Sequence, residues 1–519
     1  MEAFSQILQN SERWKAISVR YSHALSRRRI ASRKSHIGWF CFILAIGLLL
    51  FYKDLLELLP TLVVIWGVPF LLGSLAIILF RTARLSGENP YLVPFSALSL
   101  FFALAYGLGI LNVYYYDIYP WEAIPGNTLT FLRAKPALPE AALLIFVGGL
   151  GLIFGTLLSP RPLRILLPSI AIEENGSSLR TNVFFLLPLF AAATALSIQR
   201  SAPVLIRHIF TLIGDFGFLI LIVAGAEIAV KPGSGFRRWR FYVLAMVTLA
   251  LVIGTPTGMR GHTLRPFILL AIGVVIAYRR IPRWLWCTLP ILAMIVMPGL
   301  NYIKVNAGQI PDLGGLLTSS ASHVGSMGFR ERLEDGLQVF GNRVFGLPYH
   351  LGMYMQAWPE AYAFERGRTF LIELSDVLPR VLDPWKGETS GALNWYAVKA
   401  GIALEPDPAT GAWTSAVFDG ISEYYINFGP WGVLLLSIVH GYYFAILYDW
   451  LVLRSRAFFF TALFAYLIWF TWPDAGVLRR MISDSRLLVV WILLFIAVNG
   501  GSGEGQSTRH RQRPVRAQP

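Results

Sequence analysis

Apolar runs of about twenty residues recur along this chain, and they constrain its fold more than any other feature of the sequence. An α-helix crosses the core of a bilayer with roughly 20 mostly apolar residues. We count about twelve such runs, which begin near Ile37, Leu59, Tyr91, Glu140, Val183, Ile209, Phe241, Phe267, Trp284, Trp431, Ala457 and Leu487. The sequence therefore predicts an all-α polytopic membrane protein with about 12 transmembrane helices.

Positive charge is distributed unevenly over the turns between these runs. The formal net charge is +15, yet only 14% of the residues are charged, against about 25% in soluble globular proteins. The basic clusters lie at 27–34, 81–84, 161–164, 231–240, 279–283, 454–456 and 509–516. All of them fall on one side of a twelve-span topology, as the positive-inside rule requires of a cytoplasmic face. The rule accounts for the charge without a nucleic-acid partner and places both termini in the cytoplasm.

The same topology divides the chain into successive segments. They are a basic cytoplasmic segment (1–36), transmembrane helices 1–9 (37–300), a large loop (301–429), transmembrane helices 10–12 (430–499) and a basic cytoplasmic tail (500–519). The loop is predicted to be mainly helical and to lie on the non-cytoplasmic face. It is the stretch between spans that is long enough to build a site. The tail is rich in Gly, Ser and Arg, which predicts disorder.

One polar feature that the membrane does not require is Gly258-Met-Arg-Gly-His262, between the seventh and eighth predicted spans. This turn is expected on the outer side, so Arg260, His262 and the nearby Arg265 break the positive-inside pattern. An anion-binding site is one reason to keep cations there, because a planar guanidinium gives phosphate two parallel hydrogen bonds. The alternative is a tight turn whose arginines extend to the membrane interface.

The large loop combines cations with aromatic side chains. The cations are Arg330, Arg332, Arg343, Arg366, Arg368, Arg380, Lys386 and Lys399, and the aromatics include Trp358, Trp385, Trp395, Tyr396, Trp413, Tyr424 and Tyr425. Aromatic faces suit the C–H faces of sugars, and cations suit a diphosphate. The alternative is that the aromatics form an interfacial belt and the core of an extramembrane cap.

The loop ends in a pair of acidic residues four positions apart, Asp419 and Glu423. A helix would place both on one face and would then turn at 427–430 to enter the tenth span. A carboxylate at the membrane edge could act as a general base towards incoming substrate. The alternative is a solvent-facing pair that caps the helix.

Four ionisable residues fall inside predicted spans, where they are costly and are functional candidates by default. They are Asp215, Glu227, His440 and Asp449. Asp215 is the deepest, and it could line a polar cavity, relay a proton or bond to a neighbouring helix. Glu227 and Asp449 are expected at the cytoplasmic interface. The sequence has no metal-ligand spacing and no nucleotide-binding loop, so neither a metal nor a cofactor is predicted.

Three motifs suggest a family. A Gly-Ser-Arg-Gly-like turn reads Gly258-Met259-Arg260-Gly261, and a Pro-Arg followed by Lys reads Pro379, Arg380 and Lys386. The pattern Gly-Glu-x-Tyr-x-Asn-Phe-Gly-x-x-Gly reads 422–432 here, with Ser422 in place of the first Gly. On these residues, and in its topology, the chain resembles the Wzy-type O-antigen and oligosaccharide repeat-unit polymerases over roughly 258–443.

This resemblance implies a metal-independent glycosyltransferase of the GT-C class in the bacterial inner membrane. Its donor and acceptor would be undecaprenyl-diphosphate-linked oligosaccharides on the periplasmic side. A flippase and a chain-length regulator would be further partners, beside the membrane lipids. The growing polymer would pass from its lipid diphosphate to the non-reducing end of a new repeat unit.

The resemblance also implies roles for residues. Cations would hold the leaving diphosphate: Arg260, Arg343 and Arg380, with Arg265 and Lys386 secondary. Glu423 is the first candidate for the base and His262 the second. Aromatic platforms for sugar would be Trp395, Tyr424 and Tyr425. Because both substrates are lipid-anchored, a lateral opening between spans is expected.

Other functions remain open at this stage. An O-antigen ligase would share the topology, the diphosphate donor and the arginine-rich outer loop. The stretch 422–432 favours the polymerase over the ligase. A lipid-linked oligosaccharide flippase or another transporter would more typically show inverted repeats and broken mid-membrane helices. A purely structural membrane scaffold is the least favoured alternative.

Overall fold

The computed structural model describes most of the chain, in separate ranges. These are residues 28–115, 134–158, 176–198, 204–254, 260–285, 313–332, 347–375, 392–402, 419–455, 457–469 and 476–499, with a few short pieces between them.

The described residues form helices and connecting turns, without a strand. The helices of the first half are α2 (Arg28–Leu58), α3 (Thr61–Leu85), α4 (Pro94–Phe101), the π-helix η1 (Phe102–Gly107), α5 (Leu108–Tyr114), the 3₁₀-helix η2 (Lys135–Ala137), α7 (Leu138–Leu157), α8 (Gly176–Phe185), α9 (Leu187–Ile198), α10 (Val204–Val230) and α11 (Pro232–Gly254). Those of the second half are α12 (Arg260–Tyr278), α14 (Leu313–Ser326), α16 (Leu347–Ala357), α17 (Arg368–Ser375), α19 (Ala392–Lys399), α20 (Gly420–Leu447), the π-helix η4 (Tyr448–Leu453), α21 (Phe458–Trp469) and α22 (Val477–Asn499).

Within the described ranges, seven helical stretches are long and apolar enough to cross a membrane, or eight if the bent pair α8–α9 forms one span. Two shorter apolar helices, Thr263–Tyr278 within α12 and α21, accompany them. The described residues are thus all helical, as predicted, and helix length and hydropathy support a multi-pass membrane protein. The number twelve stays a prediction, and the span expected near Trp284 lies mostly outside the described residues.

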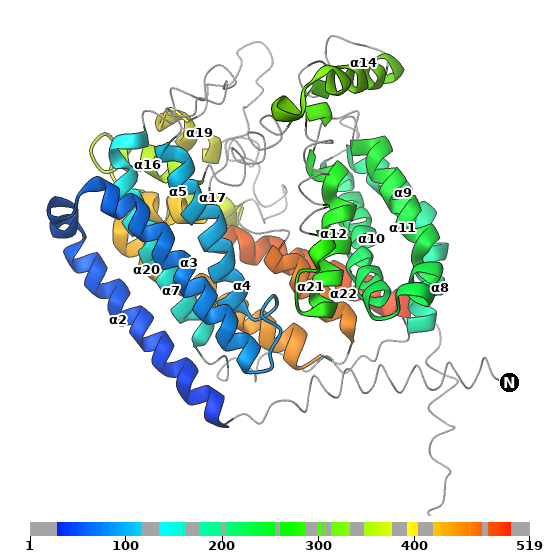
Figure 1. Ribbon diagram of the computed structural model, residues 1–519, viewed down its shortest axis with the longest axis horizontal. Helices are drawn as coiled ribbons and strands as arrows, with labels where there is room; N and C mark the ends of the chain where they lie inside the picture. The colour runs from blue at the N-terminus through cyan, green and yellow to red at the C-terminus, as the bar shows by residue number, and fades with distance from the viewer. Residues whose placement is uncertain are drawn as a thin grey trace, which may run out of the picture.

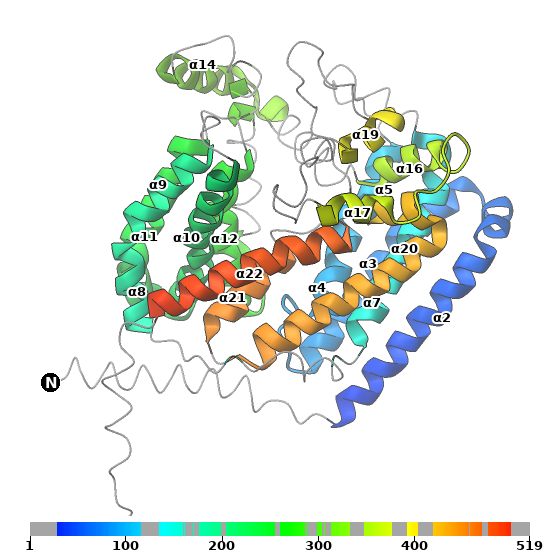
Figure 2. The ribbon, with the colours of Figure 1, turned by 180° about the vertical axis from the view of Figure 1, so that it is seen from behind.

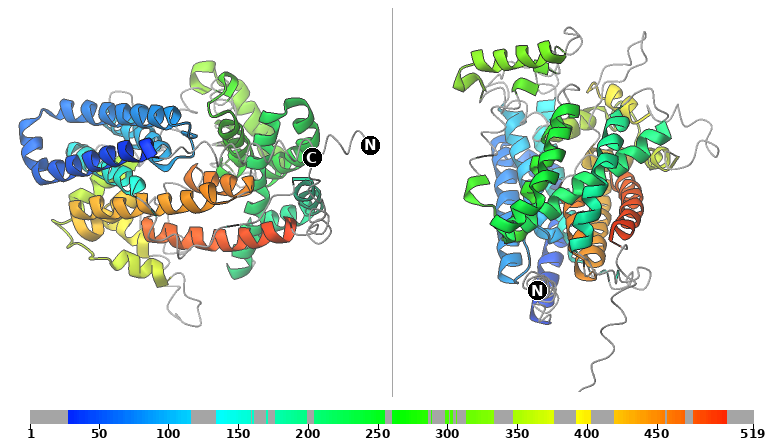
Figure 3. Two further views of the ribbon diagram at one scale, coloured as in Figure 1. Left: turned by 90° about the horizontal axis from the view of Figure 1, so that it is seen from below. Right: turned by 90° about the vertical axis from the view of Figure 1, so that its right-hand side faces the viewer.

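The helices form two groups with α21 and α22 between them (Figure 1). The first helix group contains α2, α3, α4–η1–α5, α7, α16 and α20, and the second helix group contains α8 to α12. Figure 2 shows α22 crossing from α8 in the second group to α17 beside the first. Figure 3 shows the same division from below. Helices α14, α16 and α19, from the predicted loop 301–429, lie at the same end of the molecule (top in Figure 1), with α14 over the second helix group and α16 and α19 over the first.

The first helix group is held by a close backbone contact between α7 and α20. Gly155 lies so near Ile438 that a β-carbon on it would overlap the Ile438 carbonyl oxygen. Reciprocally, a β-carbon on Gly441 would overlap the carbonyl oxygen of Leu152. Helices in lipid lack a hydrophobic drive to associate, so small residues that admit close packing decide which helices pair.

The second helix group repeats this contact between α10 and α12. A β-carbon on Gly225 would overlap the carbonyl oxygen of Leu270, and one on Gly273 would overlap that of Ile222. Each group therefore contains one helix pair in which glycines of both partners meet the backbone of the other. These crossings fix α20 and α12, the two helices that carry the candidate site residues.

We predict that Gly441→Ala destabilises the protein by about 1–3 kcal/mol, because the added methyl group forces α7 and α20 apart. The control is Gly73→Ala in α3, where a β-carbon meets nothing within 4 Å. The control should leave stability unchanged or raise it slightly through helix propensity. Thermal unfolding in detergent measures both, and equal melting temperatures would contradict the packing argument.

Candidate functional site

The outer part of α20 is a buried helical segment with defined ends. Asp419 caps its start, because the carboxylate oxygen Oδ1 accepts a hydrogen bond of 3.1 Å from the backbone N–H of Ser422. Asp419 and Glu423 are both fully buried, so the alternative of a solvent-facing, helix-capping pair is wrong about exposure and confirmed for the cap at Asp419. Burial raises the pKa of the Asp419 carboxyl group, and hydrogen bonds from Ser422 and Tyr106 oppose the rise.

The segment ends at a kink, as the sequence predicted for 427–430. Gly429 adopts a left-handed backbone with φ 64°, and Pro430 has no N–H to donate to the carbonyl oxygen of Ile426. That oxygen accepts instead from the Glu365 N–H, at 3.0 Å, and the Asn427 carbonyl oxygen accepts from the Arg366 N–H, at 2.9 Å. The carbonyl groups freed by the kink are thus satisfied by the chain that leads into α17.

The carboxyl group of Glu423 lies where α17, α20 and the start of α22 meet. Its Oε1 accepts a hydrogen bond of 2.7 Å from the Thr369 hydroxyl of α17. Asn427 donates from Nδ2 to Thr369 Oγ1, at 2.6 Å, and to the Glu423 carbonyl oxygen, at 2.8 Å. A β-carbon on Gly476 would overlap Oε2 of the Glu423 carboxyl group. A buried carboxyl group needs such partners because the interior cannot hydrate it.

Arg265 lies in the interior of the protein, within α12. Its guanidinium forms an ion pair with Asp215 of α10 and donates a hydrogen bond to the Tyr466 hydroxyl of α21. It also lies over the ring of Phe218, 5.0 Å from the centroid. Of the roles considered for Asp215, bonding to a neighbouring helix is the one that the geometry displays.

A second buried ion pair joins the first helix group to α21 and α22. Arg480 Nε lies 2.9 Å from Asp484 Oδ2, and this oxygen also accepts a hydrogen bond of 3.1 Å from the Tyr443 hydroxyl of α20. Arg480 Nη2 donates to the carbonyl oxygen of Leu467, at 2.6 Å. Sequence reasoning missed this pair because it started the last span near Leu487. The available signal was an Arg and an Asp four residues apart, directly before the apolar run of the last span.

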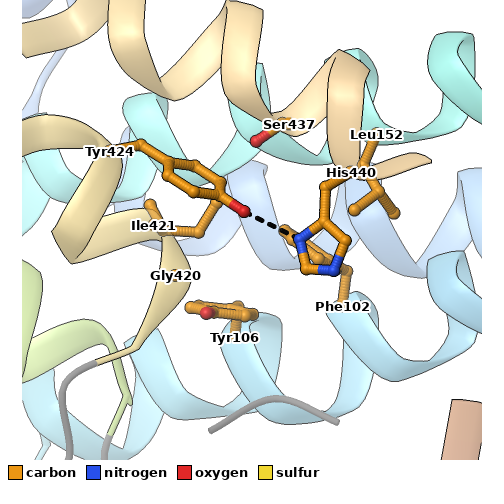
Figure 4. Close-up of a pocket in the computed structure, with 8 residues that line it drawn as sticks. All are labelled: Phe102, Tyr106, Leu152, Gly420, Ile421, Tyr424, Ser437 and His440. Atoms are coloured by element: carbon orange, nitrogen blue, oxygen red, sulfur yellow. Dashed lines mark hydrogen bonds between the residues drawn. The ribbon is translucent and has the colours of Figure 1, made fainter. Parts of the chain in front are cut away.

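Under the first turns of α20 lies a small cavity, shown in Figure 4. Its volume is about 10 Å³, room for a single water molecule. The lining residues are Phe102, Tyr106, Leu152, Gly420, Ile421, Tyr424, Ser437 and His440. The Tyr424 hydroxyl and His440 Nδ1 are hydrogen-bonded at 2.7 Å, and Tyr106 of η1 donates to Asp419 Oδ1 at 3.2 Å. The first bond joins two turns of α20 on either side of the kink, and the second anchors the start of α20 to η1.

The remaining predicted aromatic residues have contrasting surroundings. Tyr425 is buried, and its hydroxyl donates to the carbonyl oxygen of Trp358 at 3.0 Å. Tyr424 is only 1% exposed, whereas Trp395 on α19 is 45% exposed. Of these three, Trp395 is the one with a free ring surface in this conformation. Their predicted contacts with sugar stay predictions.

Several predicted cations lie wholly or partly outside the described residues. Arg260 and His262 lie in the first turn of α12, and their side chains are outside the described residues. Arg343, Arg380 and Lys386 also lie outside the described residues. Of the site residues whose side chains are described, Glu423 lies in a cluster on α20 and Arg265 lies in a separate cluster on α12.

The intramembrane acids near the expected cytoplasmic ends are buried in protein. Glu227 accepts from Arg180 and Arg238, each at 3.3 Å, and from Trp239 Nε1 at 2.7 Å. Asp449 is 4% exposed. In the described parts of the chain, no group of three His, Cys, Asp or Glu side chains is placed to hold a metal ion.

Comparison with known proteins gives no match to a family model, a curated protein or a solved structure. Function therefore has to be argued from the site itself.

We predict that Arg480→Met destabilises the protein by roughly 3–5 kcal/mol, because it leaves Asp484 buried without its ion-pair partner. The double variant Arg480→Met/Asp484→Leu should recover most of that loss, since it removes both charges. Thermal unfolding in detergent compares the two variants. A double variant no more stable than the single one would show that the pair is not a coupled unit.

Proposed function

We propose that the protein polymerises undecaprenyl-diphosphate-linked oligosaccharide repeat units into O-antigen, capsule or exopolysaccharide. The transfer would take place on the periplasmic face of a bacterial inner membrane, with both termini in the cytoplasm and without a metal. The observation that carries the proposal is Glu423, a fully buried carboxyl group at the end of a spanning helix, bonded to Thr369. Thr369 belongs to the predicted outer loop, so the acid sits where that loop meets the membrane.

The chemistry of this transfer needs a proton acceptor. The acceptor sugar's hydroxyl oxygen attacks the anomeric carbon of the donor, and the bond from that carbon to the diphosphate oxygen breaks. The hydroxyl proton passes to Glu423, and the lipid diphosphate leaves. A general base contributes about 10²–10⁴-fold to such a reaction. The hydrogen bond from Thr369 of α17 supports this role, because it holds the carboxyl group of Glu423 in one orientation.

The leaving diphosphate needs positive charge, and α12 supports its placement. This helix begins at Arg260, so the positive end of its dipole lies beside that residue. Arg265 is paired with Asp215, which neutralises its charge, so its part in this proposal is to hold α12 in position. The parts given to Arg343, Arg380 and Lys386 follow from the family resemblance alone.

We predict that Glu423→Gln and Arg260→Ala abolish long polymer while lipid-linked single repeat units accumulate. Arg260→Lys should restore little, because a point charge does not replace the guanidinium fork. The measurement is a glycan profile of the native host with the gene deleted and then complemented by each variant, with protein levels checked by immunoblot.

The same profile separates the alternatives. Long polymer that accumulates on undecaprenyl diphosphate and never reaches its final acceptor would identify a ligase. Unchanged glycans after deletion would favour a transporter or scaffold. Wild-type polymer from both Glu423→Gln and Arg260→Ala would refute the assigned site.

We predict that Thr369 acts by positioning Glu423. Thr369→Val removes the hydroxyl that donates to Glu423 and should lower the polymerisation rate by about tenfold to a hundredfold. Thr369→Ser keeps the hydroxyl and should restore the rate. If Ser and Val variants of equal abundance made equal amounts of polymer, the hydrogen bond would have no part in the reaction.

A further inference from the structure

Two basic turns that are far apart in the sequence meet at one end of α3 and α12. Arg279, at the end of α12, donates from Nη1 to the carbonyl oxygen of Gly87, after the end of α3, at 3.1 Å. Asn89 is 3% exposed, and its Nδ2 donates to the carbonyl oxygen of Ile276 at 2.9 Å. Trp469 Nε1 donates to the Tyr91 carbonyl oxygen at 2.7 Å. The two turns are thus locked together and to α21.

Tight turns fix the geometry of this junction. Gly87 and Arg279 both have left-handed backbones, with φ 73° and φ 54°. Glycine adopts this conformation without strain, but arginine does so rarely. The strained conformation of Arg279 directs the chain back towards Gly87, and the surrounding hydrogen bonds hold it there.

The junction displays a cluster of exposed arginines. The cationic cluster consists of Arg81 and Arg84 from α3 and of Arg280 and Arg283 after α12. Among the described residues, none of these four is paired with a carboxylate. Glu88 is the single acidic residue of the turn between α3 and α4. The cluster is therefore strongly positive and open to an anion.

Apolar side chains lie next to the cluster in the sequence. Leu85 is 90% exposed, Trp284 is 56% exposed and Tyr278 is 41% exposed. Tryptophan and tyrosine concentrate at the level of lipid headgroups in membrane proteins. The combination of exposed arginines with exposed apolar groups at the ends of spanning helices matches an amphiphilic anion better than a soluble one.

The basic helical turn at 237–240, within α11, is built differently. There Arg238 is paired with Glu227, which also holds Arg180, so part of the positive charge is consumed inside the protein. Arg237 and Arg240 are exposed on the same turn. If the arginines served only the positive-inside rule, both turns should bind anionic lipid alike. If the cationic cluster is a specific anion site, it should bind anionic lipid more tightly than the turn in α11.

We propose that the cationic cluster binds the phosphate headgroup of an anionic phospholipid. The arginine forks bind the phosphate oxygens, and Leu85 and Trp284 contact the acyl chains. Each arginine near an anionic surface contributes roughly a fivefold gain in binding. The inference does not rest on the proposed glycosyl transfer, because the cationic cluster is separate from the site where α17, α20 and α22 surround Glu423.

The test is native mass spectrometry of the full chain in neutral detergent, with cardiolipin, phosphatidylglycerol or phosphatidylethanolamine added. We expect the wild type to retain the two anionic lipids and to release phosphatidylethanolamine. The variant Arg84→Gln/Arg280→Gln should bind the anionic lipids at least about tenfold more weakly. The control Arg237→Gln/Arg240→Gln removes the same charge and should bind them like the wild type.

Thermal unfolding without lipid first verifies that both variants fold. Cardiolipin should then raise the melting temperature of the wild type and of the control, and inorganic phosphate at equal concentration should not. If the variant and the control bound the anionic lipids equally weakly, nonspecific charge would explain the binding, and the proposal would be overturned. Retention of phosphatidylethanolamine, or equal stabilisation by phosphate, would overturn it as well.

Discussion

The architecture depends on two helix crossings at which backbone meets backbone. Gly155 and Gly441 bring α7 against α20, and Gly225 and Gly273 bring α10 against α12. In lipid these contacts decide helix pairing, because apolar side chains are as well solvated by acyl chains as by each other. Each crossing builds one rigid half of the molecule. The candidate acid lies on a helix of one half, and the basic turn at Arg260 lies on a helix of the other.

Buried charge joins the two halves through α21 and α22. Arg265 reaches Tyr466 of α21 from the second helix group, and Arg480 of α22 binds the next carbonyl group, at Leu467. Tyr443 then connects the first helix group to Asp484. Such pairs add little net stability over apolar packing, but they are costly to break singly. These buried pairs therefore determine the relative orientation of the two halves more than the stability of the contact between them.

The sequence predicted what depends on local composition. Apolar length predicted a multi-pass helical protein, and Pro430 and Gly429 predicted the kink. The cost of Asp215 in lipid made a bond to a neighbouring helix one of three alternatives. The sequence could not predict contacts between distant segments, such as Arg265 with Tyr466 or Tyr106 with Asp419, because any of several helices could supply the partner. The pair Arg480–Asp484 was missed because charged residues were taken to lie outside the span, at the edge of the membrane. The positions of Arg343, Arg380 and Lys386 relative to Glu423 stay predictions.

The kink in α20 has a mechanical consequence. Backbone groups of 365–367 bond to Ile426 and Asn427, and the Thr369 side chain bonds to Glu423 one turn earlier. These four hydrogen bonds hold this piece of the outer loop firmly to the end of the spanning helix. A displacement of this part of the loop would therefore be transmitted to the carboxyl group of Glu423. This part of the loop and Glu423 would move together, while the part of α20 after Pro430 would stay in place.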